Sequence, residues 1–125
     1  MKNKILISVT LSLFFSFVSA NELCTDAKSE TIRNQCISQE YQKIDDSLNI
    51  LYKKYRSLLD DEDKELLKAA QINWIKYKEI DCQLYGDRYK NGYLYHYVVT
   101  NCYIEKATTR VSEISLLINL KMEDQ

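Results

Sequence analysis

The feature that most constrains this chain is its lack of turn-forming residues. Its 125 residues include no proline and only two glycines, and both glycines lie in the stretch 86–92. Folds made of many short strands need frequent tight turns, for which glycine and proline are the usual residues. A hydrophobic content of 46% is enough for one core and disfavours a disordered chain. The composition therefore predicts a single domain of a few long elements, which we expect to be helices.

The first twenty residues have the pattern of a secretory signal peptide. Two lysines precede a largely apolar run over residues 5–18, and small residues lead from it to Ala20. A charged start, an apolar middle and a small-residue end are the three parts of such a signal, and the run is shorter than the roughly 20 residues that cross a membrane. We expect cleavage after Ala20, which leaves a domain over residues 21–125 without a membrane span. An uncleaved membrane anchor is the alternative.

The charge balance excludes one class of partner. The chain has 17 Lys and Arg against 18 Asp and Glu, and removal of the signal, with Lys2 and Lys4, leaves 15 against 18, a net charge of -3. Nucleic-acid binding needs a basic excess, which is missing here. We therefore expect a mildly acidic surface and no nucleic-acid partner.

The cysteines agree with export. All four lie beyond the predicted signal and lack the spacing of a zinc site or a redox motif: Cys24, Cys36, Cys82 and Cys102. They predict two disulfides and therefore an oxidising compartment, either the bacterial periplasm or the cell exterior. Four free buried thiols are the alternative.

Apolar residues recur at helical spacing in three segments. In the first, the apolar residues are alternately four and three residues apart: Ile37, Tyr41, Ile44, Leu48, Leu51, Tyr55 and Leu58. With Ser29 as its N-cap, this seam predicts a helix over residues 30–59. The acidic turn 60–63 follows, in which Asp60 or Asp61 caps the second helix.

The second and third helices complete the fold. The second is expected to bury a stripe formed by Leu67, Ala70, Trp74, Tyr77 and Leu84 and to end near Tyr85, with Gly86 at its C-cap. Residues 86–92 form the loop, and a third helix is expected over residues 93–119. Its stripe contains Val98, Val99, Cys102, Ala107, Val111, Ile114, Leu117 and Ile118. Short connections then predict an all-α, antiparallel up-down-up three-helix bundle stapled by two disulfides.

The bundle suggests a disulfide pairing without fixing it. Cys36 and Cys82 fall at the same end of the first two helices, and Cys102 comes early in the third. We prefer Cys36 with Cys82 and Cys24 with Cys102. Four cysteines allow three pairings, and the sequence alone does not choose among them.

No group of residues has the pattern of a catalytic or metal site. His96 is the only histidine, so a multi-histidine metal site is excluded and a catalytic triad has one candidate base. The acidic run 60–63 lacks the ligand spacing of a calcium loop. We expect no catalytic residue, no metal and no cofactor, and therefore no enzyme.

A polar group is expected in the middle of the bundle. Five residues fall at about the same height: Asn49, Tyr52, Gln71, Trp74 and Arg110. We interpret them as a hydrogen-bonded polar core network that fixes the register of the helices. A ligand pocket is the alternative.

The order of several motifs along the chain is distinctive. They are Cys36-x3-Glu40, Leu48-Asn49-x-x-Tyr52, Ala70-Gln71-x-x-Trp74-x-x-Tyr77-x4-Cys82, Cys102 and Thr109-Arg110. In this order the sequence resembles the lysozyme inhibitor LprI-like family of small exported bacterial proteins. The resemblance implies a periplasmic or secreted four-cysteine helical domain that binds and inhibits lysozyme. The chain departs from the family at Lys78, where Arg is common, and it lacks the cysteine of lipid-anchored members.

A tyrosine-rich region is the candidate partner-binding surface. Six of the ten tyrosines fall between Tyr85 and Tyr103, and tyrosine gives a large contact area at low entropic cost. Lysozyme is a basic protein with a carboxylate pair in its cleft, which a loop with two basic residues would complement. The candidate binding residues are Arg88, Tyr89, Lys90, Tyr93 and Tyr95. A structural or immunity-type envelope module with no lysozyme target is the alternative function.

Overall fold

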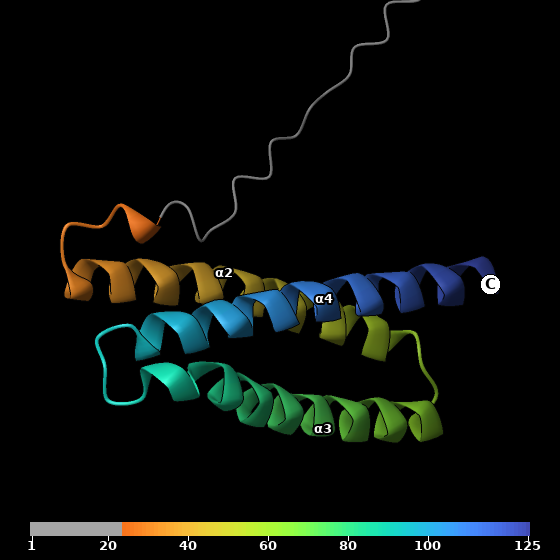
Figure 1. Ribbon diagram of the computed structural model, residues 1–125. Coiled ribbons are helices and arrows are strands. Elements are labelled where there is room, and N and C mark those ends of the chain that lie inside the picture. The colour runs from red at the N-terminus through yellow and green to blue at the C-terminus, as the bar shows by residue number, and fades with distance from the viewer. Residues whose placement is uncertain (1–23) are drawn as a thin grey trace, which may run out of the picture.

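The computed structural model describes residues 24–125, so the predicted signal peptide lies outside the described residues. These residues form three long helices, α2 (Glu30–Ser57), α3 (Asp61–Gly86) and α4 (Tyr95–Glu123), and one short 3-10 helix, η1 (Asp87–Tyr89). The long helices run up, down and up (Figure 1). The predicted all-α, antiparallel three-helix bundle with two disulfides is confirmed.

Side chains cap the first two helices as the sequence predicts. Ser29 Oγ accepts a hydrogen bond of 3.2 Å from the backbone N–H of Ile32 at the start of α2. Asp60 Oδ1 accepts one of 2.9 Å from the N–H of Asp63 at the start of α3. Both caps satisfy backbone donors that have no partner within the helix. Each helix therefore begins where its sequence signal lies, and the expected ends differ from the observed ones by a few residues.

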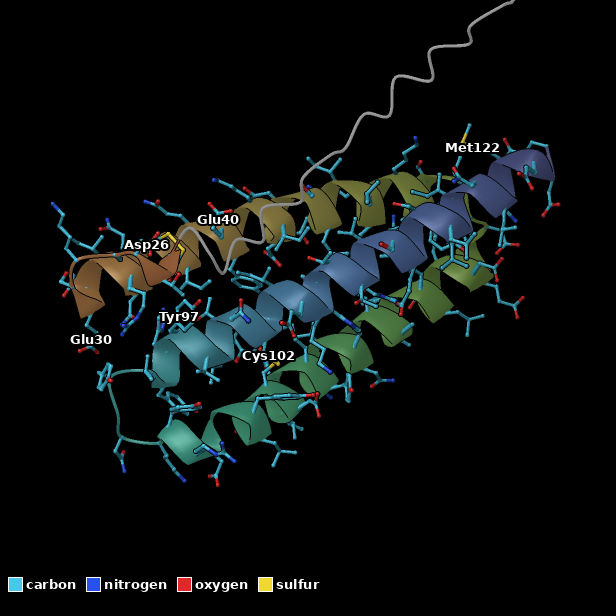
Figure 2. The ribbon with its side chains drawn as sticks, turned by 45° about the horizontal axis from the view of Figure 1, so that its top comes forward. Asp26, Glu30, Glu40, Tyr97, Cys102 and Met122 are labelled. Carbon is cyan, nitrogen blue, oxygen red and sulfur yellow. A yellow bond between two sulfur atoms is a disulfide. The ribbon has the colours of Figure 1, made fainter. Side chains whose placement is uncertain are left out.

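The middle helix of the bundle is the last one in the chain. α4 lies between α2 and α3 and packs on both, whereas α2 and α3 share little contact (Figure 1 and Figure 2). The main core lies between α2 and α4 and contains the buried residues Leu48, Ala107, Ile114 and Ile118. Partly buried members of the predicted seam surround it, namely Tyr41, Ile44, Leu51, Tyr55 and Leu58. The stripes expected for the first and third helices are thus confirmed.

The stripe expected for α3 is wrong in part. Leu67 is buried and Trp74 is partly buried, but Ala70, Tyr77 and Leu84 are exposed. Both α2 and α3 pack on α4, but α3 contacts it less extensively than α2 does and therefore buries a narrower face. The sequence period identifies the helix, but it does not show how many helices will cover it.

The preferred disulfide pairing is also wrong. The bonded pairs are Cys24–Cys36 and Cys82–Cys102, with Cα atoms 5.7 Å and 5.6 Å apart. A disulfide requires Cα atoms closer than about 7 Å. Because α4 separates α2 from α3, Cys36 and Cys82 lie on helices that share little contact. One bridge instead fastens the N-terminal segment to α2, and the other fastens the end of α3 to α4.

Gly86 is required for space rather than for an unusual backbone conformation. It is the last residue of α3, and Asp87 takes the C-cap position expected for it. A Cβ atom on Gly86 would lie 2.5 Å from Val99 Cγ2 and 2.9 Å from the ring of Tyr95. The φ of Gly86 is -77°, a value that any residue can adopt. The glycine therefore lets the end of α3 approach the start of α4.

Candidate functional site

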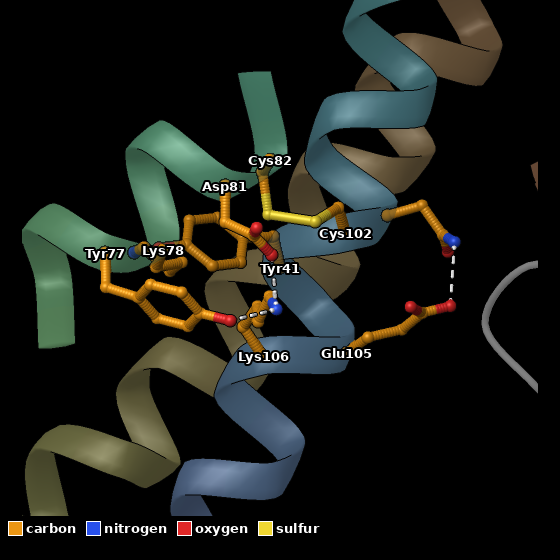
Figure 3. Close-up of a disulfide and its surroundings, with 9 residues drawn as sticks. Tyr41, Tyr77, Lys78, Asp81, Cys82, Cys102, Glu105 and Lys106 are labelled. Carbon is orange, nitrogen blue, oxygen red and sulfur yellow. Dashed lines mark hydrogen bonds and ion pairs between the residues drawn. A yellow bond between two sulfur atoms is a disulfide. The ribbon is translucent and has the colours of Figure 1, made fainter. Parts of the chain in front are cut away.

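The end of α3 is held on α4 by more than the Cys82–Cys102 disulfide. Lys106 of α4 forms an ion pair with Asp81, and its Nζ also donates a hydrogen bond of 3.1 Å to the hydroxyl of Tyr77 (Figure 3). The hydrogen bond to Asp81, followed by the one to Tyr77, raises the pKa of Lys106 and keeps its side chain charged. The disulfide and the ion pair together hold the end of α3, where the loop 86–92 begins, against α4.

The surface at this end is hollowed around two exposed side chains. Leu84 and Tyr85 are 71% and 62% exposed. A shallow hollow of about 570 Å³ has Leu84, Tyr85, Arg88 and Tyr89 in its lining, and a second of about 270 Å³ adjoins it at Leu84 and includes Lys90. We call Leu84, Tyr85, Arg88, Tyr89 and Lys90 the disulfide-end surface. It combines the exposed Leu84 and Tyr85 with two cations, and the exposed carboxylate of Asp87 lines both hollows beside them. Aromatic and arginine side chains of this kind are enriched in protein-binding surfaces.

The five predicted partner-binding residues do not all lie on this surface. Arg88 and Lys90 are exposed on it, and Tyr89 is half-buried. Tyr93 is exposed elsewhere in the loop, where the guanidinium of Arg33 lies 5.6 Å from its ring centre and donates a hydrogen bond of 2.9 Å to its carbonyl oxygen. Tyr95 packs beside Cys82 and lines the smaller hollow together with Leu84 and Lys90.

The sequence does not predict two members of the disulfide-end surface, Leu84 and Tyr85, as binding residues. The helical spacing places Leu84 in the core stripe of the second helix, whereas Tyr85 belongs to the tyrosine-rich region but is not among the five candidate binding residues. The signal that could identify them is their position next to the loop that carries both glycines, because side chains beside a loop are often uncovered.

The structure joins two of the five residues expected in a polar core network. Arg110 Nε donates a hydrogen bond of 3.1 Å to Gln71 Oε1, and its Nη1 donates one of 2.9 Å to Glu113. Asn49 is exposed and donates to Asp45, one helical turn earlier. Trp74 packs against the main core, and Tyr52 is half-buried. The contact between Arg110 and Gln71 links α4 to α3.

A second polar contact, which sequence reasoning missed, involves Lys78. This lysine is 6% exposed, and its Nζ donates a hydrogen bond of 2.6 Å to Tyr41 Oη. The Nζ also lies 5.0–5.2 Å from the ring centres of Tyr41, Trp74 and Tyr103. Three rings around one ammonium form a cation–π cage. The available signal was spacing, because Lys78 follows Trp74 by four residues and so shares its face of the helix.

The described residues show neither a metal centre nor a membrane span. Residues 24–125 contain no cluster of three or more His, Cys, Asp or Glu side chains that could bind a metal ion. None of their helices combines the length and apolar character needed to cross a bilayer. His96 forms a hydrogen bond of 2.9 Å between its Nε2 and Ser38 Oγ.

Comparisons with known proteins give a consistent result. Residues 24–114 match the protein family described as Lysozyme inhibitor LprI. The chain is 30% identical over 108 residues to an uncharacterized protein of Rhizobium meliloti (strain 1021), and the match covers 76% of this chain and 78% of that protein. No solved structure matches. The family match includes all four cysteines and the disulfide-end surface.

Proposed function

Because the chain belongs to the lysozyme inhibitor LprI family, we propose that it is an exported protein that binds and inhibits lysozyme. The observation that carries this proposal is the family match over residues 24–114. Residues 1–20 act as the signal peptide, and the domain over residues 21–125 works in the periplasm or outside the cell. The two disulfides support this location, because they persist in oxidising compartments.

The disulfide-end surface contacts the lysozyme. Its exposed Leu84 and Tyr85 supply apolar anchors, which contribute most of the binding energy of many interfaces. Arg88 and Lys90 supply cations on the loop beside them. The lysozyme cleft holds two carboxylates, so a cationic loop inserted there would compete with the substrate. The other end of the bundle begins with the acidic run 60–63, which has the wrong charge for this cleft.

The overall charge of the domain assists the encounter. With the signal removed, the chain has 15 Lys and Arg against 18 Asp and Glu, which makes it mildly acidic. Long-range attraction to a basic lysozyme raises the association rate, while contacts at the interface set the dissociation rate. We therefore expect the association rate to fall as salt increases.

A lysozyme panel tests the proposal. The oxidised protein beginning at Asn21 is mixed with lysozymes of several classes, and the clearing of a cell-wall suspension is followed by turbidity. We expect saturable inhibition of at least one class. A wall-cutting amidase is the control, because a protein that coats the walls would slow both enzymes. Binding to a lysozyme without inhibition would support a structural or immunity-type envelope module instead, and absence of binding to every class would overturn the proposal.

A further inference from the structure

The outer face of α3 is not covered by the rest of the described chain. α3 is at the edge of the bundle, where it packs on α4 and has little contact with α2 (Figure 1 and Figure 2). Leu67, Lys78 and Cys82 mark its buried side. Away from that side, Leu66 and Ile80 are each 64% exposed. Exposed apolar side chains grouped on one helix face indicate a contact surface.

Six of the exposed side chains form one continuous stripe along α3, while the less exposed Ile72 and Ile75 lie outside it. Its members are three or four residues apart and are all exposed: Leu66, Ala69, Asn73, Tyr77, Ile80 and Leu84. This spacing places side chains on a single face of a helix. We call these six residues the edge stripe. Its length is close to that of α3 itself, so its natural counterpart is another long helix.

Five of the six edge-stripe residues are arranged symmetrically about Asn73; the sixth, Leu84, lies eleven residues from Asn73, and its counterpart position is Glu62. Leu66 and Ile80 each lie seven residues from Asn73, and Ala69 and Tyr77 each lie four residues from it. A twofold axis at Asn73 would pair two α3 helices in antiparallel orientation. Leu66 of one copy then meets Ile80 of the other, and the small Ala69 meets the exposed side of the Tyr77 ring, whose hydroxyl accepts a hydrogen bond from Lys106 of its own copy. Such matching of one patch with itself is the requirement for a twofold homodimer.

We infer that the edge stripe pairs two copies of this chain into an antiparallel α3–α3 homodimer. The charges on α3 favour this orientation. In a parallel pair the acidic runs 60–63 of the two copies would face each other, and like charges in contact disfavour association. The antiparallel pair separates these runs by about 35 Å, given a rise of 1.5 Å per residue.

Charged residues at the border of the stripe support the same orientation. Glu65 and Lys76 are exposed and lie eleven residues apart, which is close to three full turns, so both border the same edge of the stripe. In the antiparallel pair, Glu65 of each copy comes within side-chain reach of Lys76 of the other. Opposite charges beside an apolar seam fix the orientation of paired helices. This inference is independent of lysozyme inhibition, and the two proposed surfaces share one residue, Leu84.

Sedimentation velocity over a range of concentrations tests the dimer. We expect the parent protein to shift from the monomer to the dimer value as its concentration rises from about 1 µM to about 1 mM, the range of weak to moderate association. The variant Leu66→Glu/Ile80→Glu should remain a monomer with unchanged helical content. The matched controls are Ile50→Glu on α2 and Leu116→Glu on α4, since these residues are 67% and 58% exposed outside the stripe. Both controls should dimerise like the parent.

Crosslinking tests the antiparallel register. Single variants Leu66→Cys and Ile80→Cys are mixed and oxidised, and we expect the 66–80 crosslink between copies to form at least tenfold faster than the 66–66 crosslink. Peptide mapping of the two native disulfides controls for exchange with the added cysteine. A parent protein that is monomeric at every concentration, or faster 66–66 crosslinking, would overturn the inference. A monomeric parent whose inhibition of lysozyme is abolished by the Leu66→Glu/Ile80→Glu change would assign the stripe to the lysozyme interface. Dimerisation without inhibition would instead overturn only the proposed function.

Discussion

The Nζ of Lys78 donates a hydrogen bond of 2.6 Å to Tyr41 Oη, and this contact joins α3 to α2, two helices that α4 otherwise keeps apart. No carboxylate forms an ion pair with Lys78 in the described chain. The rings of Tyr41, Trp74 and Tyr103 surround the charge instead. The ammonium thus has partners in all three long helices, which fixes how α2 and α3 sit on α4.

Replacing Lys78 with Met should destabilise the protein by about 1–3 kcal/mol. Met keeps most of the side-chain volume but removes the hydrogen bond and three cation–π contacts. Urea unfolding followed by circular dichroism measures the change, and a double-mutant cycle with Tyr41→Phe should show effects that are less than additive. Lys68→Met, an exposed lysine of the same helix, should change stability by less than about 0.5 kcal/mol. Equal stability of the parent and the Lys78→Met variant would show that the cage adds nothing to stability.

Each disulfide should stabilise a different part of the molecule. The Cys82–Cys102 bridge closes a separation of 20 residues between α3 and α4, and its replacement by two serines should cost about 3 kcal/mol in the chain-entropy model. Removal of Cys24–Cys36, which spans 12 residues, should instead release the segment before α2. Hydrogen exchange distinguishes the two results, because the second variant should lose protection near residues 24–37 only. If both variants lost protection throughout the domain, the two disulfides would not stabilise different parts of the molecule.

Gly86→Ala should destabilise the contact between α3 and α4. The added Cβ would lie 2.5 Å from Val99 Cγ2 and 2.9 Å from the ring of Tyr95, so these side chains or the backbone that carries them must shift. Overpacking of this kind costs about 1–3 kcal/mol, and thermal unfolding measures it. Gln83→Ala, at an exposed site near the same end of α3, is the control and should change stability by less than about 0.5 kcal/mol. A Gly86→Ala variant at least as stable as its parent would mean that the glycine is not needed for close packing.

Stability should fall at alkaline pH. Burial raises the pKa of Tyr97, against a smaller opposing effect of Arg33, and burial with help from Glu79 raises that of Tyr103. The pKa of Lys106 is also raised, first by its hydrogen bond to Asp81. The folded state therefore retains these protons after the unfolded chain has lost them, so the free energy of unfolding decreases as the pH rises above about 10.

Urea unfolding between about pH 9 and pH 11 tests this expectation. The Lys106→Met variant should show a shallower decrease than the parent, because one of the three groups no longer titrates. Absorbance of the tyrosinate band should show Tyr97 and Tyr103 titrating above the ordinary pKa of tyrosine. A free energy of unfolding that stays constant or rises in this range contradicts the assignment.

The sequence predicts features that depend on neighbouring residues of one helix. The 4-3 seam of α2 and the caps at Ser29 and Asp60 are local, since spacing and a side chain three residues away determine them. Which face of α3 is buried depends instead on helices that are distant in the sequence. Tyr77 and Leu84 have the spacing of core residues, yet they are exposed because α4, rather than α3, takes the middle of the bundle.

The central position of α4 also explains why the predicted disulfide pairing and part of the predicted polar network are wrong. The level of each cysteine along the bundle follows from counting residues, but the partner of Cys82 depends on which helix lies beside it. Arg110 and Gln71 meet because α3 and α4 are neighbours, whereas Asn49 on α2 is exposed and bonds to Asp45. Helical spacing places residues along an axis, and the packing of the helices decides which faces meet.

The loop residues of the disulfide-end surface should be required for binding but not for folding. Arg88 and Lys90 are exposed and Tyr89 is half-buried, so replacing all three with Ala should change stability by less than about 1 kcal/mol. If the loop enters the lysozyme cleft, affinity should fall by at least about 2 kcal/mol, roughly thirtyfold, because Tyr and Arg are the usual anchors of an interface. Binding calorimetry measures the loss of affinity, and a comparison of two salt concentrations gives the part of that loss that is due to charge.

The opposite end of the bundle supplies the matched control for this variant. Asp61 and Glu62 are exposed in the first turn of α3, and replacing both with Ala removes charge without touching the disulfide-end surface. This control should bind lysozyme with nearly the parent affinity at physiological salt, since distant exposed charges are screened beyond about 8 Å. Its association rate alone should fall slightly, because the domain becomes less acidic. If the control loses affinity while the loop variant inhibits as well as the parent, lysozyme binds at the acidic end of the bundle.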